Sequence, residues 1–317
     1  LQARMRELRA LLQRHGYDFV LERPTLLGFE TAEAMRNFRE QAIAHGVPEP
    51  LFTAEAPTRA ESLRIRTLGA FRVTRGQTPL SDRDFGREKA RQLLHVLAAH
   101  SGEWLPKTRL IDLLWPEADP DSADGTFRVA LNALQKALEP DRPSGKPGRY
   151  VLKQGTSYRL SEDAWLDARE FERLLAAADA FEDEAAIPLY REALTLCEGP
   201  FLAEFPQYDA WCDRERERLA ALYREGACRL ARLLVDRGDA EAASWAERVL
   251  EREPCAEEAA RALMTAQAHA GDRAQAIRTY DRLVVALDEE LDVDPMPETQ
   301  QLYERLVNLD GGAVTSL

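Results

Sequence analysis

The sequence has few cysteines, and none of them falls in a pattern typical of metal binding. Four of the 317 residues are cysteine, and Cys197, Cys212, Cys228 and Cys255 are separated by 15, 16 and 27 residues. There is no C-x-x-C pair and no histidine beside any of them. This spacing argues against a zinc site and predicts free, buried thiols instead of disulfides.

Long hydrophobic runs are absent as well. No stretch approaches the roughly 20 apolar residues that a membrane-spanning helix needs, and the first residues, Leu1 to Arg4, lack the charged-then-apolar order of a secretory signal. We therefore expect a cytoplasmic protein that does not contact a membrane. The sequence also lacks an initiator Met and begins inside an amphipathic pattern, so we expect it to be part of a longer polypeptide.

Motifs of common enzyme classes are missing too. The sequence contains no H-E-x-x-H, no phosphate-binding G-x-x-x-x-G-K and no G-x-S-x-G, and its five histidines show no metal-ligand spacing. We predict that the protein is not an enzyme and needs no cofactor and no metal.

Negative charge dominates the whole chain, with a formal net charge of −13, but it is unevenly distributed. Residues 1–62 have a net charge of −1, residues 63–161 carry 17 Lys/Arg against 11 Asp/Glu, and residues 162–317 carry 17 against 35. A basic block followed by a strongly acidic one is typical of a protein in which one domain meets phosphate and another does not.

The sequence divides into five segments. Residues 1–45 show helical spacing and are predicted to be the end of an upstream domain, and the Pro-rich residues 46–62 are predicted to be a linker. Residues 63–161 form a predicted basic domain, residues 162–310 a helical domain, and residues 311–317 a tail.

The basic segment begins with period-two apolar residues, which predict short strands from Leu63 to about Val73. Three helices are predicted next, at about 87–100, after Pro106, and at about 122–138. Two short apolar runs, 150–152 and 158–160, flank a turn at Gly155 and predict a hairpin. Strands, three helices and a hairpin occur in this order in a winged helix-turn-helix domain, an α+β fold.

The third predicted helix has two distinct faces at 100° per residue. Leu131, Leu134 and Leu138 lie on the same side as Phe127 and complete an apolar stripe. Away from this stripe, with Arg128 at its flank, lie the residues that we predict to read DNA bases, since Arg suits guanine, Asn suits adenine and Val suits the thymine methyl group. These are Arg128, Val129, Asn132 and Lys136. The alternative is an ordinary solvated helix face.

A second group of residues is predicted to contact the DNA backbone, where cations and hydroxyls fix a domain on the duplex. They lie at the starts of the first two helices, on the third helix and around the hairpin. They are Arg87, Lys89, Arg91, Lys107, Arg109, Thr126, Gln135, Lys146, Arg149, Lys153 and Thr156.

The acidic segment is helical by pattern and contains a repeat. Gly238-Asp239, Ala243 and Leu250 recur as Gly271-Asp272, Ala276 and Leu283, at a spacing of 33 residues. This spacing is close to the 34 residues of tetratricopeptide helical hairpins. We predict a mainly α protein in which an all-α, tetratricopeptide-like repeat domain follows the winged helix, with a groove suited to peptides or helices.

These segments resemble the Streptomyces antibiotic regulatory protein family. The OmpR/PhoB-type winged helix of that family is matched at 87–94, 110–116, 127–134 and 155–160. Its bacterial transcriptional activation domain is matched at 167–171, 193–194, 199–202, 211–219 and 287–295. Residues 1–45 resemble the segment before this module in large MalT-like regulators.

The resemblance implies a transcriptional activator that reads the major groove with its third helix. It further implies binding to direct repeats in double-stranded promoter DNA, as a homodimer that recruits RNA polymerase. The sequence departs from the family at Gln135, where an Arg is frequent, and at Asp119, Asp121 and Asp124. These three charges would repel phosphate, although they also favour the N-terminus of a helix. We therefore expect modest affinity without dimerisation or an activating signal. A second interpretation stays open, namely a helical-repeat interaction or effector-sensing module whose winged helix does not bind DNA.

Overall fold

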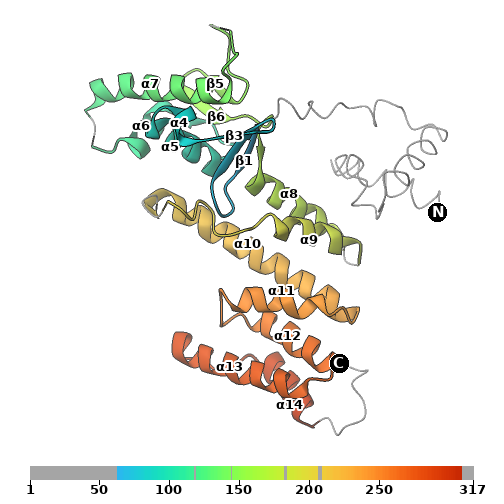
Figure 1. Ribbon diagram of the computed structural model, residues 1–317. Coiled ribbons are helices and arrows are strands. Elements are labelled where there is room, and N and C mark those ends of the chain that lie inside the picture. The colour runs from blue at the N-terminus through green and yellow to red at the C-terminus, as the bar shows by residue number, and fades with distance from the viewer. Residues whose placement is uncertain (1–62, 118, 144, 182–183, 206–208, 309–317) are drawn as a thin grey trace, which may run out of the picture.

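The computed structural model describes residues 63–308, except 118, 144, 182–183 and 206–208. The predicted upstream helical segment, the linker and the tail lie outside the described residues. Within them, the predicted architecture is confirmed: a region with two small sheets and three main helices precedes a succession of helices (Figure 1).

The first sheet has the strand order β3-β2-β1-β7. Its strands are β1 (Leu63–Arg66), β2 (Arg72–Arg75), β3 (Thr78–Leu80) and β7 (Trp165–Leu166). β1 and β2 are antiparallel, with Ile65 opposite Val73, and β7 pairs with β1 in parallel. Period-two spacing predicted β1 and β2. It missed β3 and β7, because strands of two or three residues are too short to show a period.

Three main helices follow this sheet, preceded by the single turn α4 (Asp82–Phe85), which the sequence did not predict. They are α5 (Glu88–Ala99), α6 (Lys107–Leu114) and α7 (Pro120–Leu138). All three were predicted. Pro116 lies just beyond α6, as expected of a residue that cannot continue a helix, and Pro120 opens α7, where its missing amide hydrogen costs nothing.

The predicted hairpin is formed by β5 (Val151–Gln154) and β6 (Ser157–Leu160), with Gln154 opposite Ser157. Gly155 has φ +58°, a backbone conformation that glycine adopts without strain, at the tight turn between the strands. A third strand, β4 (Leu105–Pro106), pairs with β6 and was not predicted. It joins the start of α6 to the hairpin, which is the wing of the domain.

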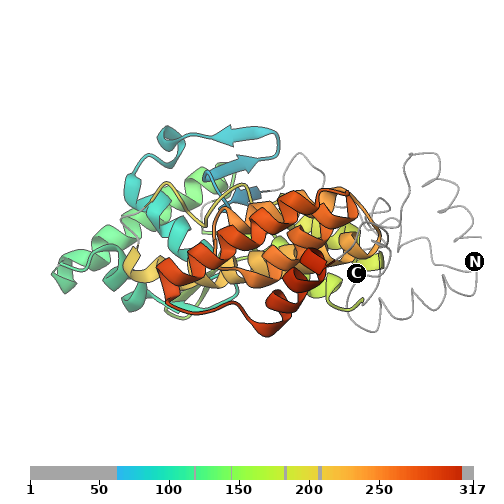
Figure 2. The same cartoon turned by 90° about the horizontal axis from the view of Figure 1, so that it is seen from below.

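The acidic segment is a stack of helices. In chain order they are α8 (Asp167–Ala178), the 3₁₀ turn η3 (Glu184–Ala186), α9 (Ile187–Thr195), α10 (Asp209–Asp236), α11 (Glu241–Leu250), α12 (Glu257–His269), α13 (Arg273–Leu291) and α14 (Pro297–Asn308). Figure 2 looks at the stack from below, with the red and orange α14 and α13 nearest the viewer.

The 33-residue repeat has a structural basis in two equivalent turns. Gly238 and Gly271 have φ +67° and +80°, which lets the chain reverse after α10 and after α12. In both turns the next amide, of Asp239 or Asp272, donates to a carbonyl five residues earlier at 2.9 Å. The proline after each repeat drifts out of register because α13 has 19 residues whereas α11 has 10.

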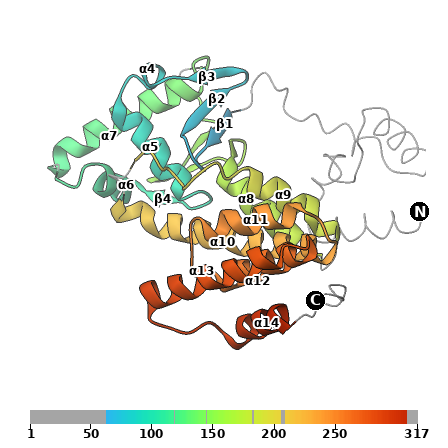
Figure 3. The same cartoon turned by 60° about the horizontal axis from the view of Figure 1, so that its bottom comes forward.

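One continuous hydrophobic core runs from the first sheet into the helical stack. At the junction, Leu68 forms an isolated bridge with Phe201, and the amide of Gly69 donates to Pro200 O at 3.1 Å. Figures 1 and 3 place α7 at one end of the molecule and α14 at the other. The basic and acidic halves of the sequence are therefore the two ends of one body.

Candidate nucleic-acid interface

Helix α7 buries one face and exposes the other, as its sequence predicted. Phe127, Leu134 and Leu138 are 0–1% exposed, and Leu131 is 9% exposed. The four residues predicted to read bases are all exposed: Arg128, Val129, Asn132 and Lys136. Val129, at 44%, is an exposed large apolar side chain on this face. Gly125 is also exposed, and a Cβ built on it would meet nothing within 4 Å.

Contacts from other elements hold the C-terminal end of α7. The Arg75 guanidinium on β2 donates to Ala137 O at 2.7 Å. The Glu139 carboxylate, directly after the helix, accepts from the amides of Arg149 at 2.9 Å and Tyr150 at 3.1 Å, where the chain enters the wing. Helix carbonyls and loop amides that would otherwise lack partners are thereby satisfied. The position of α7 relative to the wing is fixed by these bonds.

Near the N-terminal end of α7, the Asp124 carboxylate contacts two cations. One oxygen bonds the Lys107 amine at the start of α6, and the other lies 2.7 Å from the Arg128 guanidinium. The hydrogen bond from Lys107 and the positive charges of both partners hold the pKa of Asp124 below its usual value, against an opposing effect of desolvation. The repulsion expected between Asp124 and DNA phosphate is therefore offset by two neighbouring positive charges.

Further predicted backbone contacts lie around α7. Arg109 on α6 and Thr126 on α7 are exposed, as are Lys146, Lys153 and Thr156 in the loop and wing. The Lys107 amide donates to Thr156 O at 2.9 Å, which fixes the wing turn against the start of α6. The Arg149 side chain is 40% exposed, and its Nε forms an ion pair with Asp163 Oδ2 at 3.1 Å. The structure thus brings cations from α6, α7 and the wing together around one helix.

Other predicted contacts are engaged inside the protein. The Lys89 amine donates to Leu114 O at 2.5 Å and lies over the Trp115 ring. Arg91 pairs with Asp82 and lies over Phe205, on the side where the helical stack begins. Gln135 accepts from the Arg142 guanidinium at 2.9 Å. Of the predicted residues on α5, Arg87, at its N-cap, has an exposed side chain.

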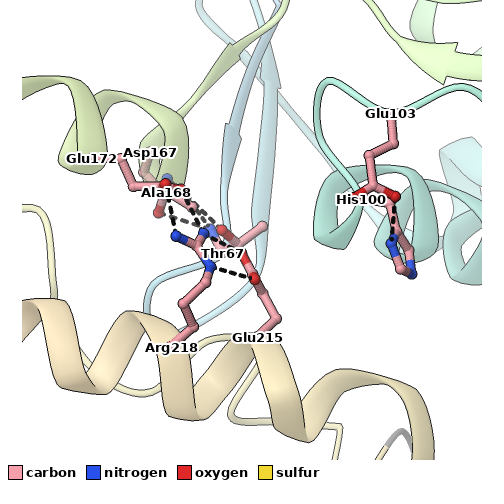
Figure 4. Close-up of polar contacts among 8 residues, drawn as sticks. All are labelled: Thr67, His100, Glu103, Asp167, Ala168, Glu172, Glu215 and Arg218. Carbon is pink, nitrogen blue, oxygen red and sulfur yellow. Dashed lines mark hydrogen bonds and ion pairs between the residues drawn. The ribbon is translucent and has the colours of Figure 1, made fainter.

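The basic region is joined to the helical stack by a buried carboxylate (Figure 4). The Asp167 carboxylate, at the start of α8, accepts from the backbone of Thr67 and Leu68 at the end of β1. These bonds fix the first helix of the stack to the first strand of the basic region. Within the stack, Arg218 of α10 binds Glu172 of α8 and Glu215 of its own helix, each at 2.8 Å.

The sequence did not identify the residues that position the site. Asp124 was predicted to repel phosphate and to favour the N-terminus of the helix, but not to pair with Arg128, although its spacing of four residues from Arg128 signals an ion pair on one helix face. Glu139 and Arg75 carried no such signal, because their partners are backbone groups that only the tertiary fold brings within reach.

The part of the chain that the structure describes also bears on three other possibilities: a metal site, a membrane-spanning helix and a reactive cysteine. It contains no group of three or more His, Cys, Asp or Glu that could hold a metal ion, and no helix long and apolar enough to cross a membrane. The four cysteines are free, as predicted, but only Cys212 and Cys228 are buried, whereas Cys197 and Cys255 are partly exposed. Burial raises the pKa of Cys197 and of Cys228 to about 12. Thiols with such pKa values are poor nucleophiles.

Comparison with known protein families gives two matches. The family described as "Transcriptional regulatory protein, C terminal" matches residues 86–160, which include α5, α6, α7 and the wing. The family described as "Bacterial transcriptional activator domain" matches residues 166–307, which include the helical stack.

Among curated proteins, the chain is similar to the regulatory protein AfsR of Streptomyces griseus, at 32% identity over 273 residues, and of Streptomyces coelicolor, at 30% over 272 residues. Each match covers 83% of this chain, and the chain spans 26% of the length of either relative. The transcriptional regulator RedD of Streptomyces coelicolor is 24% identical over 216 residues, which are 65% of this chain and 60% of RedD.

A solved structure also matches. It is Mycobacterium tuberculosis EmbR in complex with a low-affinity phosphopeptide, with a TM-score of 0.60 and 23% sequence identity. The match covers 80% of this chain and 67% of that one. At this identity the likeness supports the same fold.

Proposed function

Because the chain belongs to the Streptomyces antibiotic regulatory protein family of transcriptional activators, we propose that it binds promoter DNA sequence-specifically and activates transcription. Residues 63–161 are the DNA-binding unit and residues 162–310 the coupling unit in this proposal. The observation that carries it is the exposed face of α7, with Arg128, Asn132 and Lys136 around Val129.

In the proposed complex α7 enters the major groove. Arg128 pairs with guanine, Asn132 with adenine, and Val129 contacts a thymine methyl group, while Lys136 supports this contact from the same face. An apolar residue among polar readers is useful there, because the thymine methyl is the one apolar feature of the groove. If this face were only a solvated helix surface, the cations of α6 and the wing that surround it would have no common role.

Phosphate contacts flank the reading helix in the proposal. Arg109 on α6, and Lys146, Arg149, Lys153 and Thr156 near the wing, hold the two DNA strands on either side of α7. Lys107 adds its charge beside them while its amine bonds Asp124. Arg87 and Thr126 add to this set. Lys89, Arg91 and Gln135 are better described as structural, because their side chains bind other groups of the protein.

The helical stack supplies the coupling half of the proposal. Its end, α14, lies far from α7 (Figure 3), so the acidic residues of α13 and α14 lie away from the proposed DNA interface. Such a stack can reach a second copy bound to a neighbouring direct repeat, or RNA polymerase at the promoter. Homodimerisation on DNA and polymerase contact are thus assigned to residues 162–310.

Salt dependence tests the proposal against the interpretation as a protein-interaction or effector-sensing module. Six phosphate contacts would make log affinity for duplex DNA fall with log salt with a slope of about −5. The measurement is fluorescence anisotropy of duplexes enriched from a random library, titrated at several salt concentrations. No enrichment of any sequence, and no binding at low salt at high micromolar protein, would contradict DNA recognition.

A further inference from the structure

The two oxygens of the Asp124 carboxylate have separate partners. Oδ1 bonds the Lys107 amine, and Oδ2 lies 2.7 Å from Nη2 of Arg128, one helical turn further along α7. The side chains of Asp124 and Lys107 are 30% and 28% exposed, whereas the side chain of Arg128 is 74% exposed. The half-buried ion pair of Asp124 and Lys107 therefore anchors the solvent-exposed guanidinium of Arg128.

This arrangement restricts a side chain that would otherwise move freely. An exposed arginine samples many rotamers, and ordering it on a base pair costs conformational entropy. An acid four residues before a base on one helix face is the favourable orientation for an ion pair. Lys107 holds the opposite oxygen, and its own amide is fixed to Thr156 O at 2.9 Å. The carboxylate is thus oriented from the wing side.

The same contact leaves Arg128 able to bind a base. The ion pair with Asp124 uses Nη2, and a guanidinium has five donors in a planar fork. The remaining donors can still approach the two acceptors of guanine in the major groove. Charge also favours this role, since Lys107, Asp124 and Arg128 together carry one net positive charge.

We propose that Asp124 is a positioning residue for sequence recognition: it orients Arg128 toward one base pair, while Lys107 fixes its carboxylate. This inference rests on the proposed DNA-binding function and concerns specificity instead of total affinity. It differs from the roles that the sequence suggested for Asp124, which were repulsion of phosphate and a favourable charge at the helix N-terminus.

The test compares Asp124→Asn with the wild-type chain on two probes. One is a duplex enriched from a random library by the wild-type chain, and the other is a scrambled duplex of equal length. We expect Asp124→Asn to lose about three- to tenfold affinity for the enriched duplex, a part of the discrimination of one bidentate pair. Affinity for the scrambled duplex should stay equal or rise. Asp112→Asn, which removes one exposed charge from α6, is the matched control and should not lose specificity.

A double-mutant cycle identifies the route of the effect. In an Arg128→Ala background, Asp124→Asn should cause no further loss of specificity, because the residue that it orients is gone. Asp124→Glu keeps the charge and should retain most of the preference at the base pair that Arg128 reads. That base pair is identified by the loss of preference in Arg128→Ala. The Asp124→Glu variant also separates an effect on the orientation of Arg128 from an effect on the folding of the domain.

Two results would overturn the inference while leaving DNA binding intact. Asp124→Asn could tighten binding to both duplexes alike, as expected if the carboxylate only repels phosphate. Alternatively, it could weaken binding equally with and without Arg128, as expected if it acts through the fold. If the wild-type chain enriched no sequence at all, the proposed function itself would fail, and the inference with it.

Discussion

Thr67 donates both its amide and its hydroxyl to the carboxylate of Asp167, 100 residues further along the chain. The amide lies 2.8 and 2.7 Å from the two oxygens and the hydroxyl lies 2.7 Å from one of them. Both residues are buried, at 0% and 1% exposure. Burial raises the pKa of Asp167, and hydrogen bonds from Leu68, Thr67 and Ala168 oppose that rise. This contact joins the first strand of the basic region to the first helix of the stack.

Asp167→Ala should lower the free energy of unfolding by about 2–4 kcal/mol, because it leaves several buried donors without an acceptor. Urea denaturation measures this change. Glu162→Ala, at an exposed position nearby, is the control and should change stability by less than about 0.5 kcal/mol. Equal losses for the two variants would mean that the junction does not depend on this carboxylate.

His95 should make stability depend on pH. Burial, and then the positive charge of Arg91, lowers its pKa from 6.5 to about 3. The unfolded chain therefore takes up a proton near pH 6.5 that the folded chain refuses, so the free energy of unfolding should fall as pH drops below that value. The slope from this residue is at most about 1.4 kcal/mol per pH unit.

The measurement is urea denaturation of the wild-type chain and His95→Leu between about pH 7 and about pH 5, above the range where most carboxylates titrate. The variant should show a smaller slope, whatever its absolute stability. A slope that is identical in His95→Leu would contradict the assignment.

Two helical glycines should respond to alanine in opposite directions. A Cβ on Gly226 in α10 would lie 2.8 Å from Leu175 Cδ2, so Gly226→Ala should destabilise the chain by about 1–2 kcal/mol through overpacking. Gly125 in α7 has open space around it, so Gly125→Ala should stabilise by about 0.5–1 kcal/mol. Thermal unfolding distinguishes the two, and a stabilised Gly226→Ala would show that Leu175 moves aside easily.

Arg128 and Lys153 should separate base reading from backbone contact. Arg128→Ala should cost about 1–3 kcal/mol on the enriched duplex and relax the preference at one base pair. Lys153→Ala should weaken enriched and scrambled duplexes alike and make the salt slope shallower by about 1. Anisotropy titrations of both probes measure these effects. Equal losses on both probes for Arg128→Ala would remove Arg128 from the reading role.

Much of the fold could be predicted because its signals are local. The apolar stripe of α7, from Phe127 to Leu138, and the turns at Gly238 and Gly271 depend on residues a few positions apart. The strands β3, β4 and β7 escaped prediction because each has two or three residues and exists through pairing with a distant partner. Charge counted by segment also separated a basic half from an acidic half, since that count needs no coordinates.

The candidate site could be predicted only in part. The exposed residues of α7 followed from helical periodicity, and the structure places all four of them at the surface. Periodicity could not show that Lys89 and Gln135 bind groups inside the protein, because Leu114 O and Arg142 reach them through the packing of other elements. Net charge counts a cation equally whether it faces solvent or a carbonyl.

The sequence by itself determined the order of elements, the two faces of α7, the helical repeat and the division into a basic and an acidic half, because these depend on local spacing and composition. The tertiary structure alone decided which charges are available. It paired Asp124 with Lys107 and buried Asp167 against Thr67. The physical reason is that hydrogen bonds and ion pairs act over a few ångströms, and only folding brings residues 17 or 100 positions apart within that distance.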